Sequence, residues 1–271
     1  MIERLHHVGV IVPSAAAALK FYRDTMGLTV TADEVMTDQG VRAVLLAIGE
    51  NEIEVMEPVV PDTGVARFLA SRGPTLHHFC FSTPDIRGEL ARIKALGDVE
   101  LIDQEPRSGL AGEVAFIHPR SMHGVLVELA QPRPGAHAST GKGIDHIVCR
   151  VKDLEAAAAS WERVLGLKMT NRISTPNSII GQVPCSQTTI ELIAPTSADS
   201  PMAQQLEADG ERAVSMAAID VKDIASHVAK YRAAGYTLED ATPGVLPNSV
   251  RTSISADQTF GMSIQLIEFS C

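Results

Sequence analysis

The first apolar segment of the chain reads Leu5-His6-His7-Val8-Gly9-Val10-Ile11-Val12. It is followed by Ser14, by an amphipathic segment over 15–26, and by Gly27. A serine hydroxyl accepts from the first turn of a helix, and glycine commonly ends one, so this order predicts a strand, a short turn and a helix. The later segment Ile53-Glu54-Val55-Met56 is typical of a strand that closes the same unit.

This strand–helix–strands pattern occurs four times. The later opening strands are Leu76-His77-His78-Phe79-Cys80-Phe81, Ile144-Asp145-His146-Ile147-Val148 and Val214-Ser215-Met216-Ala217-Ala218-Ile219. Helices are expected over about 85–96, 154–165 and 224–234, each followed by a glycine. The corresponding residues of successive openings, His7, His78, His146 and Met216, lie 71, 68 and 70 residues apart. Such regular spacing predicts four repeated βαβββ modules.

The modules are expected to pair two by two, giving an α+β protein of two tandem domains with curved mixed or antiparallel sheets. The segment 131–143 is rich in proline, glycine and small polar residues, which is typical of a linker. We therefore predict a first domain over residues 1–130, a linker over 131–143 and a second domain over 144–271.

Corresponding positions of the first two modules carry ionisable residues. These are His7 and His78 in the opening strands and Glu54 and Glu128 in the closing strands. A charged group in an apolar strand is costly to bury unless it is paired or coordinated. Two imidazoles and two carboxylates suit one divalent ion, Co²⁺, Zn²⁺, Mn²⁺, Ni²⁺ or Fe²⁺, without distinguishing among them. The neighbours His6 and His77 are expected to point to the opposite faces of their strands and to be structural.

The second pair of modules carries His146, Glu191, Met216 and Gln265 at the corresponding positions. A thioether is a poor ligand for a hard divalent ion, and an amide is neutral. A vacant or decayed site is expected here, in a half that packs against the first as a pseudo-subunit.

Composition narrows the possible partners. The 271 residues carry a net charge of −10 and only 4% aromatic residues, which argues against nucleic-acid binding. No signal peptide and no long apolar segment is apparent, and the four cysteines form no CxxC pair. A cytoplasmic monomer or homodimer that does not contact membranes, with a small anionic molecule as substrate, is the expectation.

The motifs of the first half resemble those of the vicinal oxygen chelate superfamily, the glyoxalase and dioxygenase fold. Within it, the first half is similar to methylmalonyl-CoA epimerases, and the second half is a weaker, degenerate copy. The matching segments of the first half include Leu5–Val12, Glu52-Ile53-Glu54-Val55-Met56-Glu57-Pro58, Leu76–Phe81, Asp103-Gln104-Glu105-Pro106-Arg107, Phe116-Ile117-His118-Pro119-Arg120 and Gly124-Val125-Leu126-Val127-Glu128-Leu129. The resemblance implies that His7, Glu54, His78 and Glu128 are the metal ligands.

The implied activity is a divalent-metal-dependent epimerisation of methylmalonyl-CoA or a related 2-substituted acyl-CoA through a metal-stabilised enolate. Glu128 is the first candidate for the base and Glu52 the second. Arg107 and Arg120 are candidate anchors for an anionic substrate, which the resemblance suggests is an acyl-CoA.

Three features depart from the epimerase pattern. Ala43 stands where some members carry a glutamate proposed as a base, Glu113 stands where a basic residue is common, and a second pair of modules is fused to the first. Other functions therefore stay open. A metal-dependent lyase or isomerase of the glyoxalase type on a non-CoA substrate is the main alternative. A ring-cleaving iron dioxygenase and a non-catalytic binding protein are weaker ones.

Overall fold

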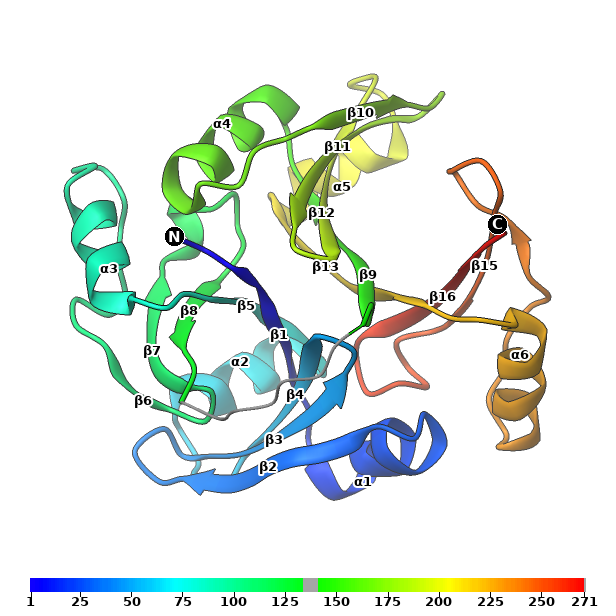
Figure 1. The fold of residues 1–271 in the computed structure, drawn as a ribbon, viewed down its shortest axis with the longest axis horizontal. Helices are drawn as coiled ribbons and strands as arrows, with labels where there is room; N and C mark the ends of the chain where they lie inside the picture. The colour runs from blue at the N-terminus through cyan, green and yellow to red at the C-terminus, as the bar shows by residue number, and fades with distance from the viewer. Residues whose placement is uncertain (134–140, 271) are drawn as a thin grey trace. The chain divides into compact units, whose positions relative to one another are not determined.

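The computed structural model of the chain describes residues 1–133 and 141–270, so part of the predicted linker lies outside the described residues. The strands form two eight-stranded sheets (Figure 1). The first sheet contains β1 (Arg4–Ile11), β2 (Thr29–Met36), β3 (Val41–Ile48), β4 (Asn51–Pro58), β5 (Thr75–Ser82), β6 (Arg107–Gly109), β7 (Gly112–Ile117) and β8 (Val127–Gln131). The second contains β9 (Ile144–Arg150), β10 (Asn171–Ser174), β11 (Ser178–Cys185), β12 (Thr188–Pro195), β13 (Arg212–Asp220), β14 (Thr242–Pro243), β15 (Ser249–Ile254) and β16 (Ser263–Phe269).

The two sheets have the same topology. The strand orders are β2-β3-β4-β1-β5-β8-β7-β6 and β10-β11-β12-β9-β13-β16-β15-β14. In each sheet the opening strands of two modules are neighbours at the centre, and the later strands of each module extend outward. The sheets are mixed, because β5 pairs with β8 in parallel whereas β7 pairs with β8 antiparallel. The predicted α+β fold of paired βαβββ modules is confirmed, while the residue boundaries of the domains stay a prediction.

One helix follows each opening strand, as the sequence predicts. α3 (Ile86–Lys94), α4 (Leu154–Leu165) and α6 (Ile224–Ala233) each begin after an aspartate whose side chain caps the first turn. The first helix differs from the expectation. Only α1 (Ala15–Leu19), capped by Ser14, is α-helical, and residues Lys20–Thr25 continue as a π-helix, in which Met26 N–H donates to Phe21 C=O.

Two further helices connect the modules within each sheet. α2 (Gly64–Arg72) lies between β4 and β5, and α5 (Pro201–Asp209) lies between β12 and β13. The pattern of repeats gave no sign of them, because α2 buries none of its side chains and α5 buries only Leu206. No helix among the described residues has the length and apolar character needed to cross a membrane.

The chain also divides into two compact units, each of which combines modules of both sheets. One contains Met1–Val8, His78–Ala138 and Ile147–Val214, and the other Gly9–His77, Ser139–His146 and Ser215–Cys271. In the first unit the ring of Phe81 on β5 meets the fully buried Trp161 of α4 edge-on, with centroids 5.9 Å apart. In the second unit the buried Tyr22 donates to the carbonyl of Thr259 at 2.9 Å. The two sheets therefore share parts of their cores.

Candidate metal centre

Strands β5 and β8 place His78 and Glu128 on one face of the first sheet. In their parallel pairing Cys80 lies opposite Glu128, and His78 precedes Cys80 by the two residues that restore the same face. The other face of β8 is directed to α3, since the Gln131 side chain accepts from the first N–H of that helix. Because neighbouring residues alternate between faces, Glu128 lies on the face of β8 opposite to α3.

Three side chains of the first compact unit converge at this face. His7 comes from β1, which lies beside β5 in the sheet, and His7, His78 and Glu128 are 1%, 2% and 6% exposed. The Nε2 atoms of His7 and His78 are 2.9 Å apart. Glu128 Oε2 lies 3.1 Å from His7 Nε2 and 3.3 Å from His78 Nε2. Two nitrogen donors and one oxygen donor therefore face one small space.

The donor set fits a divalent cation. Ligand bonds of about 2.0–2.2 Å place neighbouring donor atoms about 3 Å apart, which agrees with the three separations. Glu128 Oε2 is buried, and no described residue forms a hydrogen bond of good geometry with it. An orphaned carboxylate oxygen between two imidazole nitrogens is costly unless a cation completes it.

The electrostatics keep Glu128 in the ligand form. Burial alone would raise the pKa of its carboxyl group, but the close imidazoles of His7 and His78 outweigh burial and hold that pKa well below the usual 4.5. The carboxylate is therefore ionised at neutral pH. Its role as the catalytic base stays a prediction.

The two acidic residues of β4 belong to the other compact unit. Glu54 is 7% exposed, lies opposite Leu45 of β3, and is grouped with His7 and His78 among the buried side chains that could hold a metal ion. Glu52 is 2% exposed, shares a strand face with Glu54, and accepts a hydrogen bond of 2.5 Å from the Thr31 hydroxyl. Ala43 is buried on the adjacent β3.

The structure connects His6 to the predicted ligand His7. His6 is 2% exposed, and its Nδ1 lies 2.9 Å from Nδ1 of His7. Ligand histidines are usually oriented by a partner at their second ring nitrogen, and His6 is in that position. The expectation that His6 points away from the site missed this contact, although the His-His pair was visible in the sequence. His77 instead packs edge-on against Phe68.

The Phe116 ring separates Arg107 from His78, whereas Arg120 lies in an exposed turn. The Arg107 guanidinium sits over the Phe116 ring at 5.3 Å, and that ring meets His78 edge-on at 5.5 Å. Its ion pair with Asp103 is long, at 3.3 Å. Arg120, in the turn Pro119–Ser121, has an exposed side chain that pairs with Glu100.

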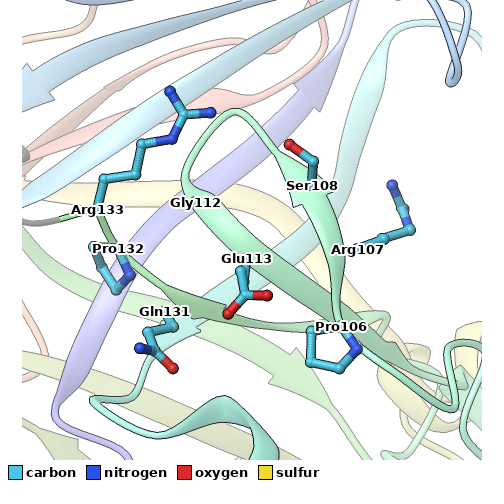
Figure 2. Close-up of a pocket in the computed structure, with 8 residues that line it drawn as sticks. All are labelled: Pro106, Arg107, Ser108, Gly112, Glu113, Gln131, Pro132 and Arg133. Carbon is cyan, nitrogen blue, oxygen red and sulfur yellow. The ribbon is translucent and has the colours of Figure 1, made fainter.

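Arg107 also lines a cavity of about 300 Å³ beside the β6–β7 hairpin (Figure 2). Arg133 and Glu113 contribute to the same cavity. The charge of Glu113 is balanced by Arg87, whose guanidinium makes two contacts with the carboxylate at 2.6 and 2.8 Å. Because Arg87 balances the charge of Glu113, the charge that the lining presents to a bound molecule comes from Arg107 and Arg133.

In the second half, the corresponding residues contact other protein groups. Asp145 lies between His146 Nδ1 at 2.7 Å and Lys142 Nζ at 2.5 Å. Glu191 accepts from the Gln182 amide at 3.1 Å. His146 and Glu191 thus each pair with another side chain of the second half. In the first half, by contrast, His7 and His78 face each other.

Asp145 is expected to lose its contribution to stability in acid. Burial alone would raise its pKa, but His146 and Lys142 lower it below the usual 3.8. A carboxyl with a lowered folded-state pKa stabilises the protein above its unfolded value and loses that contribution as the pH falls through the folded value. Asp145→Asn should therefore lower the free energy of unfolding at pH 7 and approach wild type below about pH 4. Urea unfolding between pH 7 and 3 measures this, with the exposed Asp257→Asn as control. A difference that does not change with pH would contradict it.

Two family models match the chain, and both describe the glyoxalase/bleomycin resistance protein/dioxygenase superfamily, over residues 6–118 and 143–265. The first half resembles epimerases. The ethylmalonyl-CoA/methylmalonyl-CoA epimerase of Cereibacter sphaeroides is 37% identical over 134 residues, which are 48% of this chain and 99% of that protein. The mitochondrial methylmalonyl-CoA epimerase of Mus musculus is 32% identical over 48% of this chain and 74% of its own length.

Two relatives extend into the second half. A putative lactoylglutathione lyase of Brassica oleracea is 24% identical over 64% of this chain and 58% of its own length. A mutant of the 4-hydroxymandelate synthase of Streptomyces coelicolor matches 99% of this chain and 93% of its own, with a TM-score of 0.75 and 19% identity, a likeness of fold alone. With two matching family models, repeated βαβββ modules and an epimerase relative matched over almost its whole length, the chain belongs to the glyoxalase/bleomycin resistance protein/dioxygenase superfamily.

Proposed function

We propose that the first half is a divalent-metal-dependent epimerase of methylmalonyl-CoA or a related 2-substituted acyl-CoA. The observation that carries this proposal is the buried convergence of His7, His78 and Glu128. It occurs within the half that is 37% identical to an epimerase of such substrates. Two histidine nitrogens and an ionised carboxylate oxygen that meet within 2.9–3.3 Å of one another form a donor set that suits a divalent cation.

His7, His78 and Glu128 would hold one divalent ion, with Glu54 as the fourth ligand. Co²⁺, Zn²⁺, Mn²⁺, Ni²⁺ and Fe²⁺ all accept this nitrogen and oxygen set. When bound, the ion would supply a Lewis acid that polarises a carbonyl oxygen and makes the adjacent C–H more acidic. The protein's own part is to fix the ligands, exclude water from the buried face and place a proton acceptor.

Glu52 is the base that we propose to test first. Glu128 is disfavoured because its lowered pKa makes it a poor acceptor while His7 and His78 surround it. Glu52 is buried on the strand face that carries Glu54, and the Thr31 hydroxyl orients its carboxylate. A base oriented by a hydrogen bond from a neighbouring hydroxyl keeps a fixed geometry toward the carbon from which the proton leaves.

Arg107 is proposed as the anchor for an anionic group of the substrate. It is one aromatic ring away from His78, whereas the side chain of Arg120 is exposed on a turn. A guanidinium can bind a carboxylate through two parallel N–H donors, which fixes orientation as well as charge.

Deuterium incorporation in D₂O tests the activity. Metal-loaded protein is incubated with one epimer of methylmalonyl-CoA, and deuterium at the α-carbon and stereochemical purity are followed by mass spectrometry and coupled chiral assay. Wild type should incorporate deuterium and lose stereochemical purity. His78→Ala should lower the rate by about 10³-fold, since ligand loss removes several kcal/mol of charge stabilisation.

His118→Ala serves as the matched control, because His118 caps the turn Pro119–Ser121 and should leave the rate unchanged. Absence of exchange in wild type loaded with each of the five ions would overturn the epimerase proposal. So would exchange that His78→Ala leaves intact.

A glyoxalase-type lyase acting on a non-CoA substrate is the second candidate. The lactoylglutathione lyase relative favours it, since that match covers more of this chain than the epimerase matches do. Its test is conversion of the hemithioacetal of methylglyoxal and glutathione by the same metal-loaded protein. Turnover there without exchange on methylmalonyl-CoA would select the lyase.

A further inference from the structure

A second group of donor atoms includes the His7 ring but neither His78 nor Glu128. It consists of the ring nitrogens of His6 and His7 and the sulfur of Cys80, one atom of each lying within 4.8 Å of the others. The three residues are 2%, 1% and 0% exposed. All three belong to the first compact unit, on strands β1 and β5.

The two nitrogens of the His7 ring are directed to different groups. Nε2 faces His78 Nε2 and Glu128 Oε2, whereas Nδ1 faces His6 Nδ1 at 2.9 Å. A second ion would therefore bind Nδ1 of His7, whereas the first centre uses Nε2 of the same ring. Cys80 supplies a donor of another chemical kind, because sulfur is soft whereas carboxylate oxygen is hard.

The geometry requires only small movements to accept an ion. Tetrahedral bonds of about 2.0 Å to nitrogen and 2.3 Å to sulfur place the donor atoms about 3.3–3.6 Å apart. The two imidazole nitrogens would separate by a few tenths of an ångström from 2.9 Å, and the sulfur would approach from within 4.8 Å. Such shifts are within the range of side-chain rotation.

The Cys80 side of this group lies among buried small and apolar side chains. Cys80 packs in a buried cluster with Ala111, Val114 and Ala130. A metal–thiolate bond in such an apolar place is protected from hydrolysis and oxidation, and small side chains leave room for the larger sulfur–metal geometry.

We propose that His6, His7 and Cys80 form a second metal site, selective for thiophilic cations such as Zn²⁺, Cd²⁺ or Cu⁺. Binding forms two nitrogen–metal bonds and one sulfur–metal bond; the thiol proton of Cys80 is released to solvent, and the proton held between the two Nδ1 atoms moves to another ring nitrogen or to solvent. A water molecule or other small ligand would complete the tetrahedron. The site shares His7 with the first centre but needs neither His78 nor Glu128, so its test is separate from that of the proposed epimerase activity.

Cobalt spectroscopy on the metal-free full-length protein tests the proposal. A cobalt–thiolate bond gives an intense near-ultraviolet charge-transfer band that nitrogen and oxygen ligands do not give. We expect this band in wild type and in His78→Ala, which lacks a ligand of the first centre. We expect its loss in Cys80→Ser and its weakening in His6→Gln.

Cys149→Ser is the matched control, since Cys149 is also buried but is not part of this group. The band should persist in it. Absence of the band from wild type, or its survival in Cys80→Ser, would overturn the proposal. Cadmium-113 NMR of the wild-type protein needs no variant. A resonance in the range of mixed thiolate and imidazole ligands supports the site, and only resonances of nitrogen and oxygen ligands would refute it.

Discussion

Glu128→Gln should weaken binding of the divalent ion by more than 100-fold and slow α-proton exchange by about 10³-fold. The amide keeps the size of the side chain but removes the negative charge that His7 and His78 hold ionised. Loss of an outer hydrogen-bond partner already costs about 10–100-fold in metal affinity, so loss of a charged ligand should cost more. Affinity is measured by competition with a chelator, and exchange by deuterium incorporation.

The control for this variant is Glu113→Gln on the neighbouring strand β7. Its carboxylate pairs with Arg87 on the surface and makes no contact with the histidines among the described residues. It should bind the ion as wild type does. A Glu128→Gln protein with unchanged affinity would show that His7 and His78 hold the ion without this carboxylate, and the proposed ligand set would be wrong.

Trp161→Ala should lower the free energy of unfolding by about 3–5 kcal/mol. Trp161 is fully buried in α4 and stacks edge-on against Phe81 of β5. Its removal leaves a cavity at a contact between elements of the two sheets. Chemical denaturation followed by circular dichroism measures the loss.

Trp161→Phe is the conservative comparison. The indole N–H has no partner among the described residues, so phenylalanine removes an unsatisfied donor while keeping most of the apolar volume. We expect it to cost much less than alanine. Equal losses for the two variants would mean that the ring contact with Phe81 contributes little, contrary to the packing argument.

The repeated modules made much of the fold predictable. Corresponding spacing placed His7, His78 and Glu128 in related strands, and the structure brings these three together. The helix over Leu154–Leu165 agrees with its predicted limits, because an aspartate cap and a terminal glycine mark both ends. Helix caps and the internal repeat can both be recognised from one sequence without any homologue.

Other features depend on contacts between distant segments and left no such mark. The alternation rule assigns His6 to the opposite face of β1, but its ring reaches the second nitrogen of His7. Arg107 is 29 residues from His78 in sequence, and only the pairing of β6, β7 and β8 brings it to the Phe116 ring. The π-helical turn after Leu19 also has no sequence signature that we recognise.

The contact between Phe81 and Trp161 indicates that the first half would not fold stably by itself. A truncated protein ending near residue 133 would lose α4 and expose the Phe81 ring to water, and Tyr22 would lose its acceptor at Thr259. Packing against the first half therefore constrains the divergence of the second half. Variants designed to accept another substrate should keep the second half intact and change only residues that line the cavity beside Arg107.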